Sequence, residues 1–306
     1  MQDLHQLPKL SDSLSYLYVE HAILDKSQQA IEFIQEHSRT HIPIANLTLL
    51  MLGPGTSITH AAIKTLADNG CTVLWTGQDA TRFYAQGLGE TRKAQRLLYQ
   101  AQLVSNPSKR QQIVINMYRY RFHEILPLDL SLPQIRGLEG VRVRQTYAQA
   151  SKKYGVPWHG RNYDRNNWRN ADPINRALSA ANALLNGLCH AAIVSGGYSP
   201  GLGFVHTGKQ LSFVYDIADL YKTEFTIPTA FATIAKGTHQ VESRVRATCR
   251  QAFKDGKLLQ RILPDIDTIL TLPDNDAQPI DPNGDIDTDP ALPTRLWSRI
   301  EGDEEE

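Results

Sequence analysis

The sequence contains, at residues 206–222, the stretch His206-Thr-Gly-Lys-Gln-Leu-Ser-Phe-Val-Tyr-Asp216-Ile-Ala-Asp219-Leu-Tyr-Lys222. If its second half is helical, the spacing of three places Asp216, Asp219 and Lys222 on one face. Two neighbouring carboxylates repel each other, so they need a cation, a proton or water. A divalent metal ion held by oxygen ligands is one interpretation. The other is an ordinary first helix turn, whose dipole favours acidic residues.

Length and composition indicate an intracellular protein of two domains. The chain has 306 residues, enough for two hydrophobic cores. Its three cysteines (Cys71, Cys189 and Cys249) form no CxxC pair, which argues against a zinc knuckle or a disulfide framework and favours a cytoplasmic location. We expect no signal peptide, because the first residues have neither a basic nor an apolar run. The most apolar segment, 177–195, is interrupted by polar residues and predicts a buried helix, so no membrane contact is expected.

The net charge of zero conceals a sorted distribution. Residues 265–306 hold 13 acidic and 2 basic residues, whereas residues 81–170 hold 16 basic and 5 acidic ones, an excess of 11 positive charges. Such a basic block is what a polyanion-binding surface requires. A set of unrelated solvated helix faces is the alternative.

The first part of the chain predicts a β-rich domain. Short apolar runs separated by turns are typical of strands, and a helical period over 57–69, ending at Gly70, predicts one short helix. We expect Thr56 or Ser57 to cap this helix. The preceding Gly53-Pro-Gly55 is either an ordinary turn or a phosphate-binding helix entry. The predicted strands are 14–19, 30–34, 47–52, 72–75 and 82–85.

Strand-like alternation gives way to helical periodicity near Gly87-Leu-Gly89. The prediction is therefore an α+β protein, with a β-sandwich-like domain at 1–86, a larger helical domain at 90–272 and a flexible Pro-rich acidic tail at 273–306. The expected helices are two over 90–126, split at Asn106-Pro107, and others at 134–154, 172–195, 227–236, 241–255 and 257–271. The segment 158–169 interleaves aromatic and Arg residues, which suits either base stacking or a self-clamped loop.

One more motif lies in the basic block. Glu139 stands among Arg136, Arg142 and Arg144, with Gly137 and Gly140 on either side of it. An ion pair within the helix is the simple interpretation. Each glycine, however, costs a helix about 1 kcal/mol relative to alanine, which suggests that something approaches the backbone closely here.

Three motifs, in their order and spacing, resemble the CRISPR-associated adaptation integrase, Cas-one. They are Arg136-Gly-Leu-Glu139-Gly-Val-Arg-Val-Arg, Gly203-Phe-Val-His206-Thr-Gly-Lys209 and Leu211-Ser-Phe-Val-Tyr215-Asp216-Ile-Ala-Asp219. Further matches are Leu52-Gly-Pro-Gly-Thr56 with His60-Ala-Ala, and Tyr154-Gly-Val-Pro-Trp158 with Gly160-Arg-Asn-Tyr163. The resemblance covers residues 14–270 and is greatest to the subtype I-E branch.

The resemblance implies a metal site formed by Glu139, His206 and Asp219, with Asp216 beside them as a fourth catalytic group. One nitrogen and several oxygen ligands suit Mg²⁺ or Mn²⁺. The implied reaction is a transesterification in spacer acquisition, in which the 3′-hydroxyl of a captured duplex attacks a phosphodiester at the edge of a CRISPR repeat. A metal-dependent nuclease for branched DNA and a non-catalytic nucleic-acid scaffold are the alternatives.

The resemblance also implies partners and DNA contacts. The enzyme is expected to work as two homodimers bridged by a dimer of the small partner protein, Cas-two, on double-stranded DNA. The expected DNA-contacting residues are Arg82, Arg136, Arg142, Arg144, Tyr163, Lys209 and Tyr215.

We predict that affinity for duplex DNA falls steeply as salt is raised. Each phosphate neutralised by the basic block releases counterions and contributes about −0.9 to the slope of log affinity against log salt. Fluorescence anisotropy with a labelled duplex, between about 50 and 200 mM salt, measures this slope. A flat response contradicts the assignment of residues 81–170 to a DNA surface.

Overall fold

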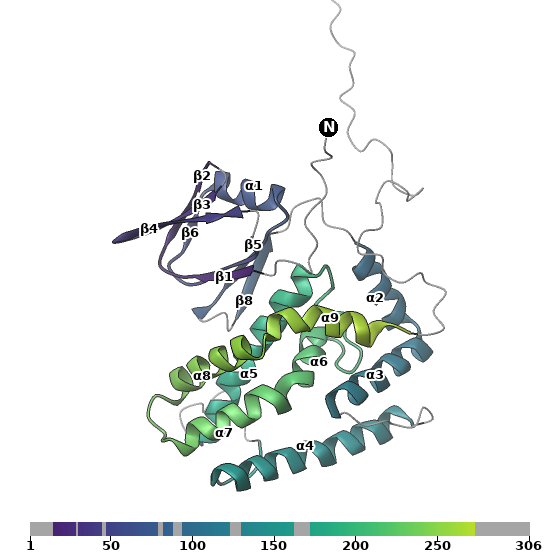
Figure 1. Ribbon diagram of the computed structural model, residues 1–306. Helices are drawn as coiled ribbons and strands as arrows, with labels where there is room; N and C mark the ends of the chain where they lie inside the picture. Colours follow the sequence, from purple (N-terminus) through teal and green to yellow (C-terminus); the bar gives the residue numbers. More distant parts are fainter. Residues whose placement is uncertain are drawn as a thin grey trace, which may run out of the picture.

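The structure is a computed structural model that describes residues 15–28, 30–44, 47–78, 82–87, 94–122, 130–161 and 172–272. Its strands form a smaller unit and most of its helices a larger one, and the two units lie against each other (Figure 1). The α+β class expected from the sequence is confirmed. All described strands end by Gly87 and the helical unit begins at Gln95. The domain limits at 1–86, 90–272 and 273–306 stay predictions.

The strands form two sheets of four that enclose an apolar core together with α1 (His60–Asp68). Leu24 and Ile31 from one sheet meet Leu50 and Val73 from the other, with Leu66 of α1 beside them. The first sheet has the order β1-β5-β7-β8, in which β8 alone is antiparallel. The second has the order β4-β3-β2-β6, in which β6 is parallel to β2. The strands are β1 (Ser15–Val19), β2 (Ile23–Ser27), β3 (Ala30–Gln35), β4 (Ser38–Pro43), β5 (Leu47–Leu52), β6 (Ser57–Ile58), β7 (Thr72–Thr76) and β8 (Phe83–Gly87).

The five predicted strands correspond to β1, β3, β5, β7 and β8, whereas β2, β4 and β6 were not predicted. β4 is an edge strand with almost every side chain exposed, so it carries no apolar alternation that a sequence pattern reveals. The expected cap of α1 was also wrong. Thr59 caps this helix by accepting a hydrogen bond from the Ala62 amide at 3.2 Å, because Ser57 belongs to β6. Gly70 follows the helix with a φ of +69°, as expected for a stop.

The turn at Gly53 and Gly55 is a structural one. A Cβ at Gly53 would lie 2.3 Å from the Tyr18 hydroxyl, and one at Gly55 would lie 2.5 Å from His21 Nδ1. Gly55 also has a φ of +70°, which disfavours other residues. The chain then enters β6 rather than a helix, so this turn is not the phosphate-binding helix entry considered above.

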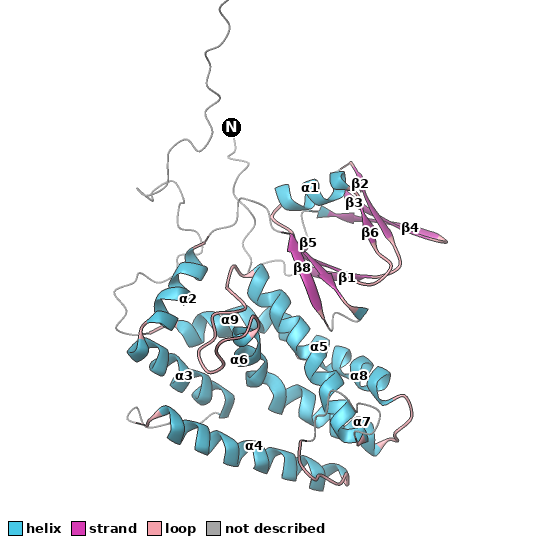
Figure 2. Ribbon diagram, turned by 180° about the vertical axis from the view of Figure 1, so that it is seen from behind, coloured by secondary structure: helices cyan, strands magenta, loops and turns pink. Residues whose placement is uncertain are grey.

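The helical unit is built around α5 (Figure 2). By length and composition alone α5 is a candidate membrane span, yet 67% of its most apolar window is buried among the surrounding helices. We therefore assign it as a core helix, as predicted for residues 177–195. The helices are α2 (Gln95–Ser105), α3 (Pro107–Phe122), α4 (Leu132–Tyr154), α5 (Pro173–Ser195), α6 (Ser212–Tyr221), α7 (Ile227–Ala235), α8 (Val241–Asp255) and α9 (Leu258–Leu270), with a π-helical segment at Lys222–Thr226.

The C-terminal half of α5 joins the two units. Ala191 and Val194 pack against Leu49, Met51 and Leu74 on the outer face of the first sheet. On the same helix, the His190 ring lies 3.9 Å from the Phe83 ring of β8, centroid to centroid. His190 Nε2 is buried with no hydrogen-bond partner among the described residues.

We predict that acid weakens this junction through His190. Burial lowers the pKa of His190 to about 4, from 6.5 when unfolded. Between pH 6.5 and 4, His190 binds a proton in the unfolded chain but not in the folded one. The contribution of neutral His190 to the free energy of unfolding is therefore full above pH 6.5 and falls as the pH drops toward 4, by up to about 1.4 kcal/mol per pH unit. Urea unfolding at several pH values tests this. His190→Leu should lose much of the dependence, and an equal acid loss in both proteins contradicts the assignment.

Candidate active site

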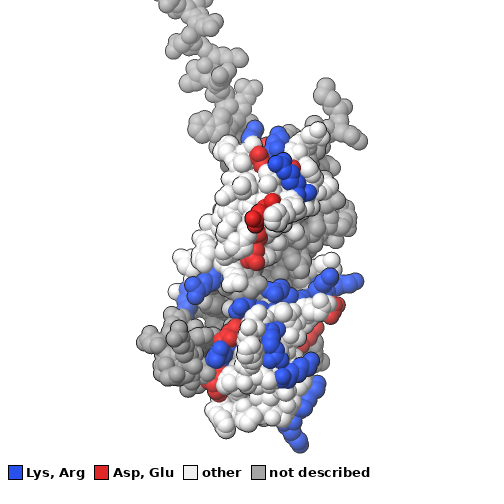
Figure 3. Space-filling model, turned by 90° about the vertical axis from the view of Figure 1, so that its left-hand side faces the viewer, with Lys and Arg blue, Asp and Glu red and all other residues white. Residues whose placement is uncertain are grey.

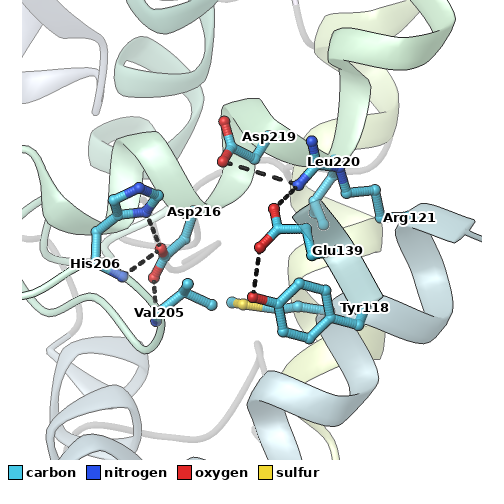
Figure 4. A pocket seen from close by; sticks show the side chains of 9 residues that line it. Tyr118, Arg121, Glu139, Val205, His206, Asp216, Asp219 and Leu220 are labelled. Atoms are coloured by element: carbon cyan, nitrogen blue, oxygen red, sulfur yellow. Dashed lines mark hydrogen bonds and ion pairs between the residues drawn. The ribbon is translucent and has the colours of Figure 1, made fainter. Parts of the chain in front are cut away.

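A small pocket lies where α3, α4 and α6 meet the loop that precedes α6 (Figure 4). It brings together the four predicted catalytic residues, which come from three separate segments of the chain. The lining residues are Met117, Tyr118, Arg121, Glu139, Val205, His206, Asp216, Asp219 and Leu220.

Buried polar bonds hold the glycine-rich loop 196–203 that leads to His206. Gln100 of α2 is fully buried, and its amide group donates to the Ser199 and Leu202 carbonyls and accepts from the Ser199 N–H. Gly203 is required by a close approach, because a Cβ there would lie 2.3 Å from the His206 carbonyl oxygen. The loop therefore delivers His206 to the pocket with a defined backbone path.

Asp216 fastens the end of this loop to α6. One of its carboxylate oxygens accepts hydrogen bonds from the Phe204 and Val205 amides at 2.6 and 3.1 Å. The other accepts from the His206 amide at 2.8 Å and lies 2.7 Å from His206 Nδ1. The Asp216 side chain is completely buried. Because both oxygens are engaged, Asp216 positions His206 and has little capacity left for a ligand.

The Asp216 contact also selects the tautomer of His206. With Nδ1–H donated to the carboxylate, the neutral ring has its lone pair on Nε2, the arrangement typical of a metal-binding histidine supported by a carboxylate. The same hydrogen bond raises the pKa of His206. The side chain remains 43% exposed, so the ring is reachable from outside.

Glu139 of α4 is held by α3. Tyr118 donates a hydrogen bond of 2.8 Å to one carboxylate oxygen, and Arg121 donates to the other. Burial, together with the charge of Glu139, raises the pKa of Tyr118, so its hydroxyl stays protonated as a donor. The simple interpretation of this motif, an ion pair of Glu139 with Arg136 or Arg142 of its own helix, is not what the described residues show. A partner one helix away replaces it, because the carboxylate points into the pocket rather than along its own helix.

Asp219 lies one helical turn after Asp216 and has two cationic neighbours. Lys222, three residues on, forms an ion pair with one carboxylate oxygen, and Arg121 lies 3.9 Å from the other. The predicted common face of Asp216 and Asp219 is thus observed, since both line the pocket. At Lys222 the helix widens into its π-helical turn, a feature often found at functional sites.

The side chains of the pocket are of the types that bind a divalent cation, but they are not spaced to bind one together. Two carboxylates and one imidazole are the donors that Mn²⁺ or Mg²⁺ accepts, and Asp219 Oδ1 is buried without a hydrogen bond, although Lys222 is in contact with it. Among the described residues, no group of three His, Cys, Asp or Glu side chains is placed to hold one ion. The Arg121 guanidinium lies between Glu139 and Asp219 instead (Figure 4).

Four of the predicted DNA-contacting residues lie on α4 or just before α6. Arg136 is exposed and reaches the Val205 carbonyl at 3.5 Å, which places it beside the pocket. Arg142 stacks over the Phe122 ring at 5.2 Å. Arg144 and Lys209 are exposed.

Of the remaining three, Arg82 and Tyr215 are not among the residues that line the pocket. Arg82 is exposed in the turn between β7 and β8, in the other unit. The Tyr215 ring packs edge-on against His206 at 5.8 Å. Tyr163 lies outside the described residues, as does most of the aromatic and Arg segment 158–169. Trp158, at its start, stacks on Tyr147 at 4.5 Å, so this part of the segment is clamped by its own chain.

Sequence reasoning did not assign Tyr118 and Arg121 to the site. A signal for them exists in α3, where Val114, Met117, Tyr118 and Arg121 recur at helical spacing. The first three are buried, and Arg121 continues their stripe with a side chain that is only 7% exposed. An arginine on the apolar face of a helix indicates a buried acidic partner elsewhere in the chain.

The fold and the pocket agree with the relatives of this chain. Residues 15–128 and 121–251 match the family described as CRISPR associated protein Cas1, so the chain belongs to this family, the Cas-one of the sequence motifs. It is 52% identical over 307 residues to CRISPR-associated endonuclease Cas1 2 of Thermus thermophilus, covering 99% of this chain and 92% of the relative. It is 40% identical over 279 residues to CRISPR-associated endonuclease Cas1 of Escherichia coli K12, covering 89% and 92%.

A solved structure gives the same result. The TtCas1–DNA complex is 54% identical to this chain, superposes with a TM-score of 0.77, and is covered over 99% of its length by 86% of this chain. The family expected from the motifs is therefore confirmed. The assignment to the subtype I-E branch stays a prediction.

We predict that Asp216→Asn loosens the loop before α6. The amide would turn an N–H₂ group toward backbone donors, and hydrogen bonds to a charged acceptor contribute about 1.5–3 kcal/mol each. Stability should fall by roughly 2 kcal/mol or more. Hydrogen exchange at the amides of residues 204–206 should accelerate. Asp219→Asn is the matched control, since Asp219 accepts no hydrogen bond from a backbone N–H of the described residues. Equal exchange in the two variants contradicts the role of Asp216.

Proposed function

We propose that this protein is an integrase of CRISPR adaptation, which joins the 3′-hydroxyl ends of a captured duplex to a CRISPR repeat by metal-dependent transesterification. One observation carries the proposal. In a chain of the Cas1 family, Glu139, His206 and Asp219 come from separate segments and line the same pocket. The relatives are named endonucleases, and the TtCas1 structure is a DNA complex, which supports DNA as the substrate.

The reaction exchanges one phosphodiester for another. The 3′-oxygen of the captured strand forms the new bond to phosphorus, the repeat's own 3′-oxygen leaves, and the proton moves from the attacking hydroxyl to the departing oxygen. Bound to Glu139, His206 and Asp219, Mg²⁺ or Mn²⁺ would polarise the phosphoryl oxygen and lower the pKa of the attacking hydroxyl. No ATP is required, because the number of phosphodiester bonds is unchanged.

The protein's own groups bind and orient. Asp216 fixes the ring of His206, and Tyr118 fixes the carboxylate of Glu139. Arg136 reaches the loop at Val205, and Lys209 is exposed, which supports the proposal that both contact phosphates of the DNA near the pocket.

The surface of α4 supports close approach of DNA. Gly137 and Gly140 flank Glu139, and a Cβ added to either would meet no atom of the described residues within 4 Å. Packing within the chain therefore does not require glycine there, although glycine weakens the helix. A DNA backbone that passes close to Glu139 would explain why glycine is found at these two positions. The neighbouring Arg136 and Arg144 would complement the negative charge of that DNA.

Charge on the rest of the molecule is mixed. Figure 3 shows one face on which Lys and Arg side chains spread over the helical unit, with Asp and Glu among them. The positive excess of residues 81–170 is therefore best tested by the salt dependence of binding. Membership of the family supports a homodimer that pairs with the small partner Cas-two, as two homodimers bridged by a partner dimer.

A nuclease for branched DNA is the alternative that shares this pocket. The two differ in whether a duplex with free 3′-hydroxyls is joined to the target or the target is only cut. A scaffold without chemistry does not explain why three potential ligands from separate helices and a loop meet at one opening.

We predict that Asp219→Ala abolishes joining. The purified protein, its partner, a short duplex and a repeat-bearing plasmid are incubated with and without Mn²⁺, and joined products are counted on a gel. The wild type should join only with metal, and the variant should lose at least about a hundredfold in rate because a ligand is missing. Arg176→Gln, in an ion pair with Glu242 outside the pocket, should join normally. Wild-type joining by Asp219→Ala shows that the ligand assignment is wrong.

A further inference from the structure

Arg121 occupies the space between the two carboxylates to which a metal ion is assigned. Its guanidinium donates to Glu139 and lies 3.9 Å from Asp219, between the two side chains (Figure 4). The side chain is only 7% exposed, and Arg121 Nε is buried without a hydrogen-bond partner among the described residues. Arg121 is therefore held mainly by the two neighbouring carboxylates, because not all of its N–H groups have hydrogen-bond acceptors.

Charge compensation explains why it is there. Glu139 and Asp219 are each about one-fifth exposed, and two such carboxylates facing one pocket repel strongly. Arg121 and Lys222 together supply two positive charges for these two negative ones. With Asp216 included and His206 neutral, the pocket holds three carboxylates against these two cations, so a divalent cation would turn its net charge from negative to positive unless a resident cation moves away.

Arg121, rather than Lys222, is the cation that a metal ion between Glu139 and Asp219 would have to displace. Lys222 contacts Asp219 alone, from the end of the same helix. Arg121 comes from another helix and bridges both carboxylates. Its departure alone frees an oxygen of Glu139 and the space beside Asp219 together.

We propose that Arg121 is the internal counter-cation of this site, which bridges Glu139 and Asp219, compensates their negative charge and is displaced when Mg²⁺ or Mn²⁺ binds. This inference rests on the metal site of the proposed function. Arg121 is then a positioning residue that competes with the metal. Once displaced, its planar guanidinium is free to bind a phosphate of the incoming DNA, so that metal and DNA favour each other's binding.

Binding of Mn²⁺ alone tests the competition. Free Mn²⁺ is measured by electron paramagnetic resonance during titration of the full-length protein, without DNA. Arg121→Gln removes the competitor, so its affinity for Mn²⁺ should rise on the order of tenfold. Without Mn²⁺ the variant should melt at a lower temperature than the wild type, and Mn²⁺ should raise its melting temperature more.

Three further proteins complete the experiment. Arg176→Gln removes an arginine from another Arg–Glu pair, with Glu242, and should bind Mn²⁺ like the wild type. Asp219→Ala should lose the site. Arg121→Lys keeps the charge on a shorter side chain without the planar guanidinium, so its affinity for Mn²⁺ should lie between those of the wild type and Arg121→Gln. This variant decides the matter if Arg121→Gln does not fold.

The coupling to DNA gives a second readout. A short duplex should tighten Mn²⁺ binding to the wild type, and this effect should shrink in Arg121→Gln. Mn²⁺ affinity that is unchanged or weaker in a folded Arg121 variant overturns the inference and leaves the metal site intact. Wild-type protein that binds no Mn²⁺ sensitive to Asp219→Ala overturns both the inference and the metal site.

Discussion

The buried carboxylate of Asp216 is the group on which the rest of the pocket depends. It accepts hydrogen bonds from the amides of Phe204, Val205 and His206 and from the ring of His206. A single side chain therefore joins the loop to α6. A loop of this kind carries several backbone donors that must be satisfied away from water. One buried acid satisfies three of them and orients the imidazole, which makes the position of His206 a consequence of loop stability.

Charge compensation is the second constraint on the pocket. Acidic side chains gathered at one opening are tolerated because cations from the same chain accompany them: Arg121 from α3 and Lys222 from the end of α6. Under the proposed metal site, this pairing would compete with an incoming cation. Protein stability and metal affinity would then be opposed at Arg121.

The two units of the fold contribute in different ways. The helical unit supplies every residue of the pocket, whereas the sheets offer α5 an apolar face at Leu49, Met51 and Leu74. The junction contains His190, whose ring packs against Phe83. Because burial lowers the pKa of this ring, we expect the stability of the junction to depend on pH. The pocket lies apart from this junction, since no described residue of α5 or of the sheets lines it.

The amino-acid sequence by itself determined the local features of this protein: the α+β order of elements, the shared face of Asp216 and Asp219, and, through its motifs, the family. These follow from periodicity and from residue types a few positions apart. Only the tertiary structure decided that the Asp216 carboxylate is taken up by His206 and the loop before it, and that Glu139 pairs with Arg121 rather than with a neighbour on α4. The physical reason is that periodicity states which face a side chain occupies, whereas its partner depends on which helix packs against that face.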